Sequence, residues 1–136
     1  MQDQPDTAPH RTDSPESPFK GRTGLRRVWN ALHYSLAGLK AAYAGEDAFR
    51  KEVWLAVPMI VVVLFLPVDG TGRALMIGSV FLVLVVELLN SAIEAAVDRI
   101  GLEPHRLSKR AKDIGSAAVL VALLNAAAVW ACILAG

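Results

Sequence analysis

The stretch Val86-Glu87-Leu88-Leu89-Asn90-Ser91-Ala92-Ile93-Glu94-Ala95-Ala96-Val97-Asp98-Arg99 places acidic residues on a helix that begins in an apolar medium. The uncharged residues 74–86 run directly into this stretch without a turn signal. At about 100° per residue, Glu87, Glu94 and Asp98 fall within roughly 40° of one another, and Asn90 lies roughly 60° to one side. Carboxylates in a bilayer are costly unless they are paired, solvated or functional. The stretch therefore predicts a membrane-embedded polar site with oxygen ligands that suit Mg²⁺.

The composition of the chain is that of a membrane protein. Hydrophobic residues make up 54% of the sequence and the mean hydropathy is +0.40, which is too apolar for an ordinary soluble domain. The single cysteine, Cys132, excludes a disulfide framework and a cysteine metal cluster. The net charge of +1 carries little information, and we expect no nucleic-acid partner. Because the first thirty residues lack an apolar segment, we expect the first membrane span to act as its own insertion signal.

The N-terminal third divides into a polar tail and an amphipathic helix. Residues 1–23 are rich in proline and acidic residues, and we expect them to be a disordered tail. From Leu25, apolar residues recur at steps of three and four up to Tyr43, which predicts a helix over about residues 25–44 that ends at Gly45. Its basic residues and Trp29 favour a helix on a membrane surface. The alternative is a helix packed on a soluble core, which the rest of the chain does not offer.

Three apolar segments follow, and we expect each to span the membrane. They cover about residues 48–67, 73–100 and 113–135, so the predicted fold is an all-α membrane domain over residues 24–136. Pro58 is tolerable in the first span where neighbouring helices or water satisfy the freed carbonyl. The Pro, Asp and Gly content of residues 67–72 predicts a turn between the first two spans.

The distribution of basic residues orients these spans. Lysine and arginine are concentrated before the first span and in the connection 99–113, whereas the turn 69–73 holds only Arg73. By the positive-inside rule, the N-terminus and the connection 99–113 are cytoplasmic, and the C-terminus lies on the external side. The acidic stretch therefore ends at the cytoplasmic face of the inner membrane.

Several groups converge at that face. We expect Lys112 and Asp113 at the start of the last helix, where a helix N-terminus and a lysine attract phosphate. A carboxyl in an apolar setting, such as Glu87, suits proton transfer from a hydroxyl. Together these groups favour metal-assisted transfer of a phosphoryl group from a nucleotide to a lipid hydroxyl.

Other interpretations remain open from the residues alone. Glu87 fits a small proton-coupled transporter, and Asn90 fits a hydrogen bond between helices. Lys112 and Asp113 fit an interfacial anchor and an N-cap. A non-catalytic assembly subunit is a further alternative. Three spans are few for an enzyme or a transporter, so we expect an oligomer.

The acidic stretch resembles the signature of the small prokaryotic diacylglycerol kinases. Two further blocks are similar to that family: residues 34–52, with Tyr34-Ser35, Gly38-Leu39 and Ala48-Phe49-Arg50, and residues 110–120, with Arg110-Ala111-Lys112-Asp113. The resemblance covers about residues 25–136. It implies a homotrimeric helical bundle in which each subunit has a surface helix and three spans. It also implies ATP- and Mg²⁺-dependent phosphorylation of diacylglycerol to phosphatidic acid.

The resemblance also implies roles for individual residues. It places the catalytic base at Glu87, the metal ligands at Glu46 and Glu94, and the nucleotide-binding residues at Tyr34, Asn90, Asp98, Glu103, His105, Lys112 and Asp113. It places lipid substrate contacts at Arg27, Lys40, Ala48, Arg50, Glu52, Glu87 and Trp130. A sister branch of the family phosphorylates undecaprenol with the same catalytic residues. The stretch Gly115-Ser116-Ala117-Ala118 is more similar to the diacylglycerol branch.

Overall fold

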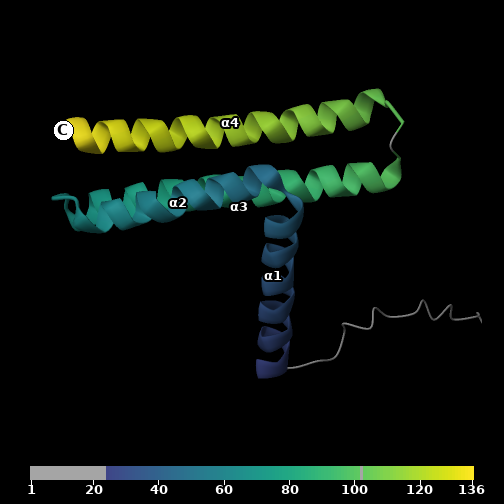
Figure 1. The fold of residues 1–136 in the computed structure, drawn as a ribbon, viewed down its shortest axis with the longest axis horizontal. Coiled ribbons are helices and arrows are strands. Elements are labelled where there is room, and N and C mark those ends of the chain that lie inside the picture. Colours follow the sequence, from purple (N-terminus) through teal and green to yellow (C-terminus); the bar gives the residue numbers. More distant parts are fainter. Residues whose placement is uncertain (1–23, 102) are drawn as a thin grey trace, which may run out of the picture. The chain divides into compact units, whose positions relative to one another are not determined.

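The computed structural model describes residues 24–101 and 103–136, and within these ranges the chain is all-helical (Figure 1). The helices are α1 (Leu25–Gly45), α2 (Asp47–Phe65), α3 (Gly70–Ile100) and α4 (Arg106–Ala135). The predicted all-α class is therefore confirmed. The predicted disordered tail, residues 1–23, lies outside the described residues.

The described residues fall into two units, of which the first ends at Leu36 and the second begins at Ala37. The described part of the first unit is the beginning of α1, which ends at Gly45 as the sequence predicts. Its apolar side chains recur on one side of the helix and are exposed, including Trp29, Leu32 and Leu36. An exposed apolar stripe beside arginine residues is typical of a helix that lies on a membrane surface.

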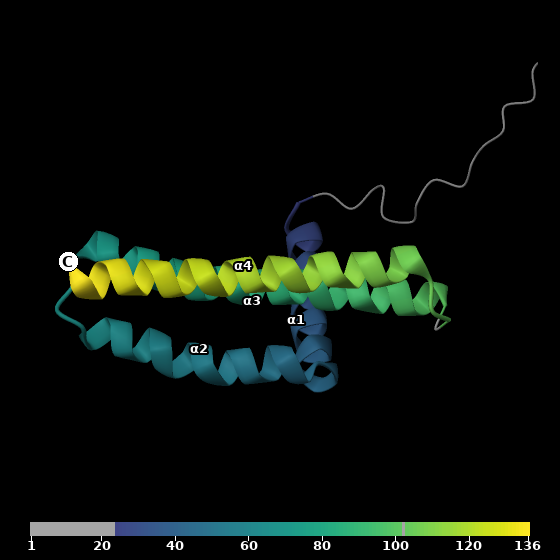
Figure 2. The same ribbon diagram turned by 90° about the horizontal axis from the view of Figure 1, so that it is seen from above.

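In the second unit, α2 and α4 each pack along α3 (Figures 1 and 2). Short connections join α2 to α3 and α3 to α4, and each of these pairs runs antiparallel. Val83 of α3 packs with Ala122 and Ala126 of α4 in the buried core, and the side chains of Met76 and Val63 are fully buried. Small residues such as alanine let two helix backbones approach closely, as is typical of helix pairs in membranes.

The turn between α2 and α3 is fixed by capping contacts. Asp69 is the N-cap of α3, and its Oδ1 accepts a hydrogen bond from the Gly72 amide at 2.8 Å. Arg73 Nη2 donates to the carbonyls of Leu66 and Val68 at 3.5 and 3.4 Å. Helix α3 therefore begins at Gly70, earlier than the sequence predicts, because this cap replaces the last part of the expected turn.

Two of the helices in the described ranges, α3 and α4, are long and apolar enough to cross a membrane. Helix α2 does not pass the same test. Its first turns hold Arg50, Lys51 and Glu52, which leave only residues 53–65 of the helix uncharged.

The prediction that α4 begins near residue 113 is wrong. His105 is the N-cap, its Nδ1 accepts from the Leu107 amide at 3.2 Å, and the helix runs from Arg106. Lys112 and Asp113 therefore lie within the helix, and Asp113 is not its N-cap. Lys112 therefore does not lie at the helix N-terminus that is expected to attract phosphate, and it can attract phosphate only through its own charge.

Candidate active site

The polar residues of α3 pass from the interior of the helix bundle to its surface. Glu87 is only 4% exposed and Asn90 8%, Glu94 is half-buried, and the Asp98 carboxylate is exposed. By a helix rise of about 1.5 Å per residue, Glu87 and Asp98 lie roughly 16 Å apart along α3. A carboxyl held in an apolar interior is thus connected to the surface by polar groups on one helix.

Asn90 connects the buried and exposed parts of this series. Its Nδ2 donates a hydrogen bond to Glu94 Oε1 at 3.1 Å. Its Oδ1 is buried and has no hydrogen-bond partner among the residues that the structure describes. Glu94 is therefore held by an interior amide, which restricts the directions its carboxylate can take.

Helix α2 brings two more carboxylates to the same region. Glu46 is the N-cap of α2, and Glu52 is half-buried six residues later. Glu52 lines a small cavity together with Val83 and Leu84 of α3, the helix that carries Glu87 and Glu94. Several carboxylates on facing helices repel one another unless some are protonated or a cation lies among them.

A cavity of about 590 Å³ lies where α3 ends and α4 begins. This volume is within the range of small-molecule sites, about 300–1,000 Å³. Five of the residues assigned to nucleotide binding from the sequence line it: Asp98, Glu103, His105, Lys112 and Asp113. The cavity also has three cationic side chains, Arg106, Lys109 and Lys112, as a polyphosphate site requires.

Ion pairs order the charged side chains around this cavity. Lys112 Nζ lies 2.6 Å from Asp98 Oδ1 and so joins α4 to α3. Lys109 Nζ lies 2.7 Å from Asp113 Oδ2, one turn away on α4, and both of these side chains are exposed. The first pair links the two helices, whereas the second lies within one helix, and both are exposed enough that each contributes little stability.

Comparison with known proteins identifies the family. The model of the family described as prokaryotic diacylglycerol kinase matches residues 33–134. The chain belongs to this prokaryotic diacylglycerol kinase family. It is 59% identical over 120 residues to the diacylglycerol kinase of Pseudomonas aeruginosa, covering 88% of this chain and 98% of that protein.

Other diacylglycerol kinases are similar over much the same part of the chain. The Escherichia coli K12 protein is 54% identical over 112 residues, which are 82% of this chain and 91% of that one. The Helicobacter pylori J99 protein is 47% identical over 107 residues, which are 79% of this chain and 84% of that one. The resemblance drawn from the acidic stretch is therefore confirmed at the level of the family.

The carboxylates of this diacylglycerol kinase family member fit Mg²⁺ when the ion also binds a nucleotide. No group of three or more His, Cys, Asp or Glu side chains within residues 24–101 and 103–136 is placed to hold a metal ion. Mg²⁺ is commonly bound through only one or two carboxylates together with substrate phosphates, and not in an all-protein cage. Glu94, half-buried and held by Asn90, and Glu46 would supply those carboxylates.

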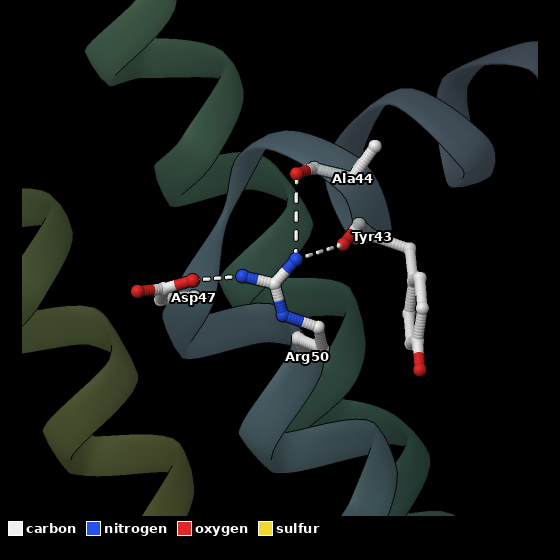
Figure 3. A network of polar contacts seen from close by, with 4 residues as sticks. All are labelled: Tyr43, Ala44, Asp47 and Arg50. Carbon is white, nitrogen blue, oxygen red and sulfur yellow. Dashed lines mark hydrogen bonds and ion pairs between the residues drawn. The ribbon is translucent and has the colours of Figure 1, made fainter.

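Arg50 fixes the entry to α2, whose N-cap is Glu46, through contacts with Tyr43, Ala44 and Asp47 (Figure 3). Its Nη1 donates to the carbonyls of Tyr43 and Ala44 at 3.2 and 3.4 Å, and its Nη2 pairs with Asp47. The guanidinium thus binds the last carbonyls of α1 and the first turn of α2. These contacts restrain the backbone between α1 and α2, where Glu46 lies.

Not all of the residues assigned from the family are brought together in the described chain. Arg27 and Tyr34 belong to the first unit and are exposed, and Lys40 and Ala48 are also exposed. Trp130 Nε1 donates to the carbonyl of Met76 at 3.4 Å. Met76 precedes Glu87 by about 16 Å of helix rise, so Trp130 lies far from the carboxylates.

The structure places some residues at the site that are not assigned to it from the sequence. Arg106, Ser108 and Lys109 line the cavity, and the i,i+4 spacing of Lys109 and Asp113 was a signal that the region is helical. Gly115 is buried against Asn90. That contact had no sequence signal because it depends on the register between α3 and α4.

Proposed function

We propose that this chain catalyses transfer of the γ-phosphoryl group of ATP to the free hydroxyl of diacylglycerol, giving phosphatidic acid and ADP. The family supports the activity, and the observation that carries the chemistry is the buried Glu87 carboxyl, on the same helix as the hydrogen-bonded Asn90 and Glu94. A bond forms between the lipid oxygen and the γ-phosphorus, and the bond from that phosphorus to the bridging oxygen of ADP breaks. The hydroxyl proton passes to a Glu87 carboxylate oxygen.

The nucleotide occupies the cavity between α3 and α4. Lys112 and the neighbouring cations bind its phosphates, and Glu94 and Glu46 would hold Mg²⁺ against them. Mg²⁺ supplies neutralisation of the phosphate charge when it is bound. The remaining groups proposed to bind the nucleotide are Tyr34, Asn90, Asp98, Glu103, His105 and Asp113.

The lipid approaches the same carboxylates from the membrane side. Arg27, Lys40, Ala48, Arg50 and Glu52 bind its polar part, and Trp130 contacts its acyl chains deeper in the bilayer. A small apolar cavity of about 50 Å³ lies beside Glu52, between α2, α3 and α4. This volume is far below that of small-molecule sites, so the cavity admits at most a short hydrocarbon segment of the lipid beside the carboxyl.

The topology follows from the charges. α2, α3 and α4 span the inner membrane, with Arg50 and Lys51 extending their charged ends to the interface, and α1 lies on the cytoplasmic surface. The N-terminus and the site are cytoplasmic, and the C-terminus is external. Only 6% of the apolar segment of α4 is buried within the chain, so lipid and, in the proposed homotrimer, other subunits cover the rest of it.

The test is transfer of labelled γ-phosphate from MgATP to lipid in mixed micelles, with diacylglycerol and undecaprenol offered separately. We expect labelled phosphatidic acid from diacylglycerol, and a loss of about 10²- to 10⁴-fold in Glu87→Gln, the usual contribution of a general base. The matched control is Asp69→Asn, which removes one carboxylate at the other end of α3 but keeps the N-cap. Transfer only to undecaprenol would reassign the substrate, and an active Glu87→Gln protein would refute the base.

A further inference from the structure

Helix α4 packs tightly against α3 at Gly115, directly opposite Asn90. A methyl group placed on Gly115 would overlap Asn90 Oδ1 and would lie 3.2 Å from Asn90 Cγ and 3.9 Å from its Cα. By contrast, nothing lies within 4 Å of the same position at Gly78 on α3. The absence of a side chain at residue 115 thus creates the space that the Asn90 carboxamide occupies.

Asn90 has little freedom to move elsewhere. The residue is only 8% exposed, and Gly115 is buried as well. Because Asn90 Nδ2 is engaged by Glu94, its Oδ1 faces the α4 backbone at Gly115. A helix Cα–H group there is a weak donor of the kind found between closely packed helices, and it favours this orientation of the amide over the flipped one.

We propose that Gly115 is a positioning residue for the phosphoryl-transfer site. It admits the Asn90 carboxamide against α4 in the one orientation that presents Nδ2 to Glu94, and so fixes the Glu94 carboxylate for the metal–nucleotide complex. The inference rests on the proposed function for the role of Glu94, whereas the contact between Gly115 and Asn90 stands without it.

A double-mutant cycle tests this role. Gly115→Ala displaces the Asn90 amide, and we expect kcat/KM for MgATP to fall about 10- to 100-fold, the usual effect of losing a group that orients a metal ligand. The half-saturating Mg²⁺ concentration should rise while the KM for lipid stays unchanged. In an Asn90→Ala background, which lacks the overlapping oxygen, Gly115→Ala should cost less than about twofold. An equal loss in both backgrounds would show that the alanine acts through the backbone and would overturn the proposal.

The matched control is Gly78→Ala, the same change at an open position of a neighbouring helix. It should leave both the activity and the Mg²⁺ dependence unchanged. If Gly115→Ala does not fold, the Asn90→Ala/Gly115→Ala protein still should, since the overlap is gone. Failure of both proteins to fold would count against the proposal.

A spectroscopic measurement separates this inference from the proposed function. The asparagines of the chain are Asn30, Asn90 and Asn125, so ¹⁵N-asparagine labelling gives a simple set of side-chain amide signals. Gly115→Ala should shift the Asn90 signal and leave the others in place, and an unmoved Asn90 signal would refute the contact. If the wild-type protein transfers no phosphate, the proposed function fails, and this spectrum still decides the position of Asn90.

Discussion

Lys112 Nζ on α4 lies 2.6 Å from Asp98 Oδ1 on α3, so an ion pair closes the two helices over the cavity they share. Both side chains are partly exposed, at 38% and 47%, and solvent therefore screens the pair. Its importance is geometric, because it places the Lys112 ammonium on the wall of the cavity of about 590 Å³ between the two helices.

This arrangement predicts that Lys112→Met weakens the binding of ATP more than it destabilises the fold. A charge-assisted contact to phosphate is lost, and we expect the KM for ATP to rise about tenfold or more, measured at saturating lipid. Arg110→Met is the control, because this arginine is exposed on the same helix and does not line the cavity. An equal rise in both variants would indicate a general charge effect.

Glu94→Gln should differ from Glu87→Gln in its response to magnesium. A metal ligand lost from a site that also uses substrate phosphates weakens binding without abolishing it. We expect the half-saturating Mg²⁺ concentration of Glu94→Gln to rise about 10- to 100-fold, with activity recovered at high Mg²⁺. Glu87→Gln should remain inactive at every Mg²⁺ concentration, because a lost proton acceptor is not replaced by metal. Recovery of both variants would contradict the separate roles.

Substitutions in the turn between α2 and α3 should change the stability of the protein but not its phosphoryl-transfer activity. Asp69→Ala removes the N-cap that binds the Gly72 amide, and we expect a loss of about 1 kcal/mol in the free energy of unfolding. Asp69→Asn keeps a capping side chain and should be nearly neutral. Unfolding in detergent monitored by circular dichroism measures both, and the KM for ATP should not change in either variant. A raised KM in Asp69→Ala would show that the two ends of α3 are coupled.

The close contact between α3 and α4 predicts that added volume is not tolerated at Ala122. This residue is 4% exposed and packs with Val83. Ala122→Leu should destabilise the protein by about 1–3 kcal/mol, the usual cost of overpacking a core. Ala118→Leu, one turn earlier and exposed within the chain, is the comparison. Equal unfolding midpoints for the two variants would contradict the packing described here.

The sequence predicts the elements more readily than their junctions. The periodicity from Leu25 to Tyr43 and the uncharged residues before Glu87 locate α1 and α3 to within a few residues. The sequence prediction places the start of α4 too late, because residues 106–113 are mostly charged or polar and have the low hydropathy of a loop. They are nonetheless good helix formers, among them Leu107, Lys109 and Ala111, and His105 caps them.

The contacts between helices in the site depend on the axial register of α3 against α4, and this register cannot be read from a single sequence. The acidic stripe on α3 could be predicted because its residues share one helix face. The Lys112–Asp98 pair and the approach of Gly115 to Asn90 join α4 to α3. To predict these two contacts, one must know how far α3 and α4 are shifted along each other. That axial shift is set by the packing of small residues such as Ala122.

The length of α4 has a consequence for the lipid environment. Its 30 residues extend about 45 Å at ~1.5 Å per residue, whereas the hydrocarbon core of a bilayer is about 30 Å thick. The charged turns from Arg106 to Asp113 form the part that extends beyond the hydrocarbon. A thicker bilayer would draw Lys112 toward the headgroups, and a thinner one would raise it into water. A change in bilayer thickness would therefore change the depth at which Lys112 lies relative to the headgroups.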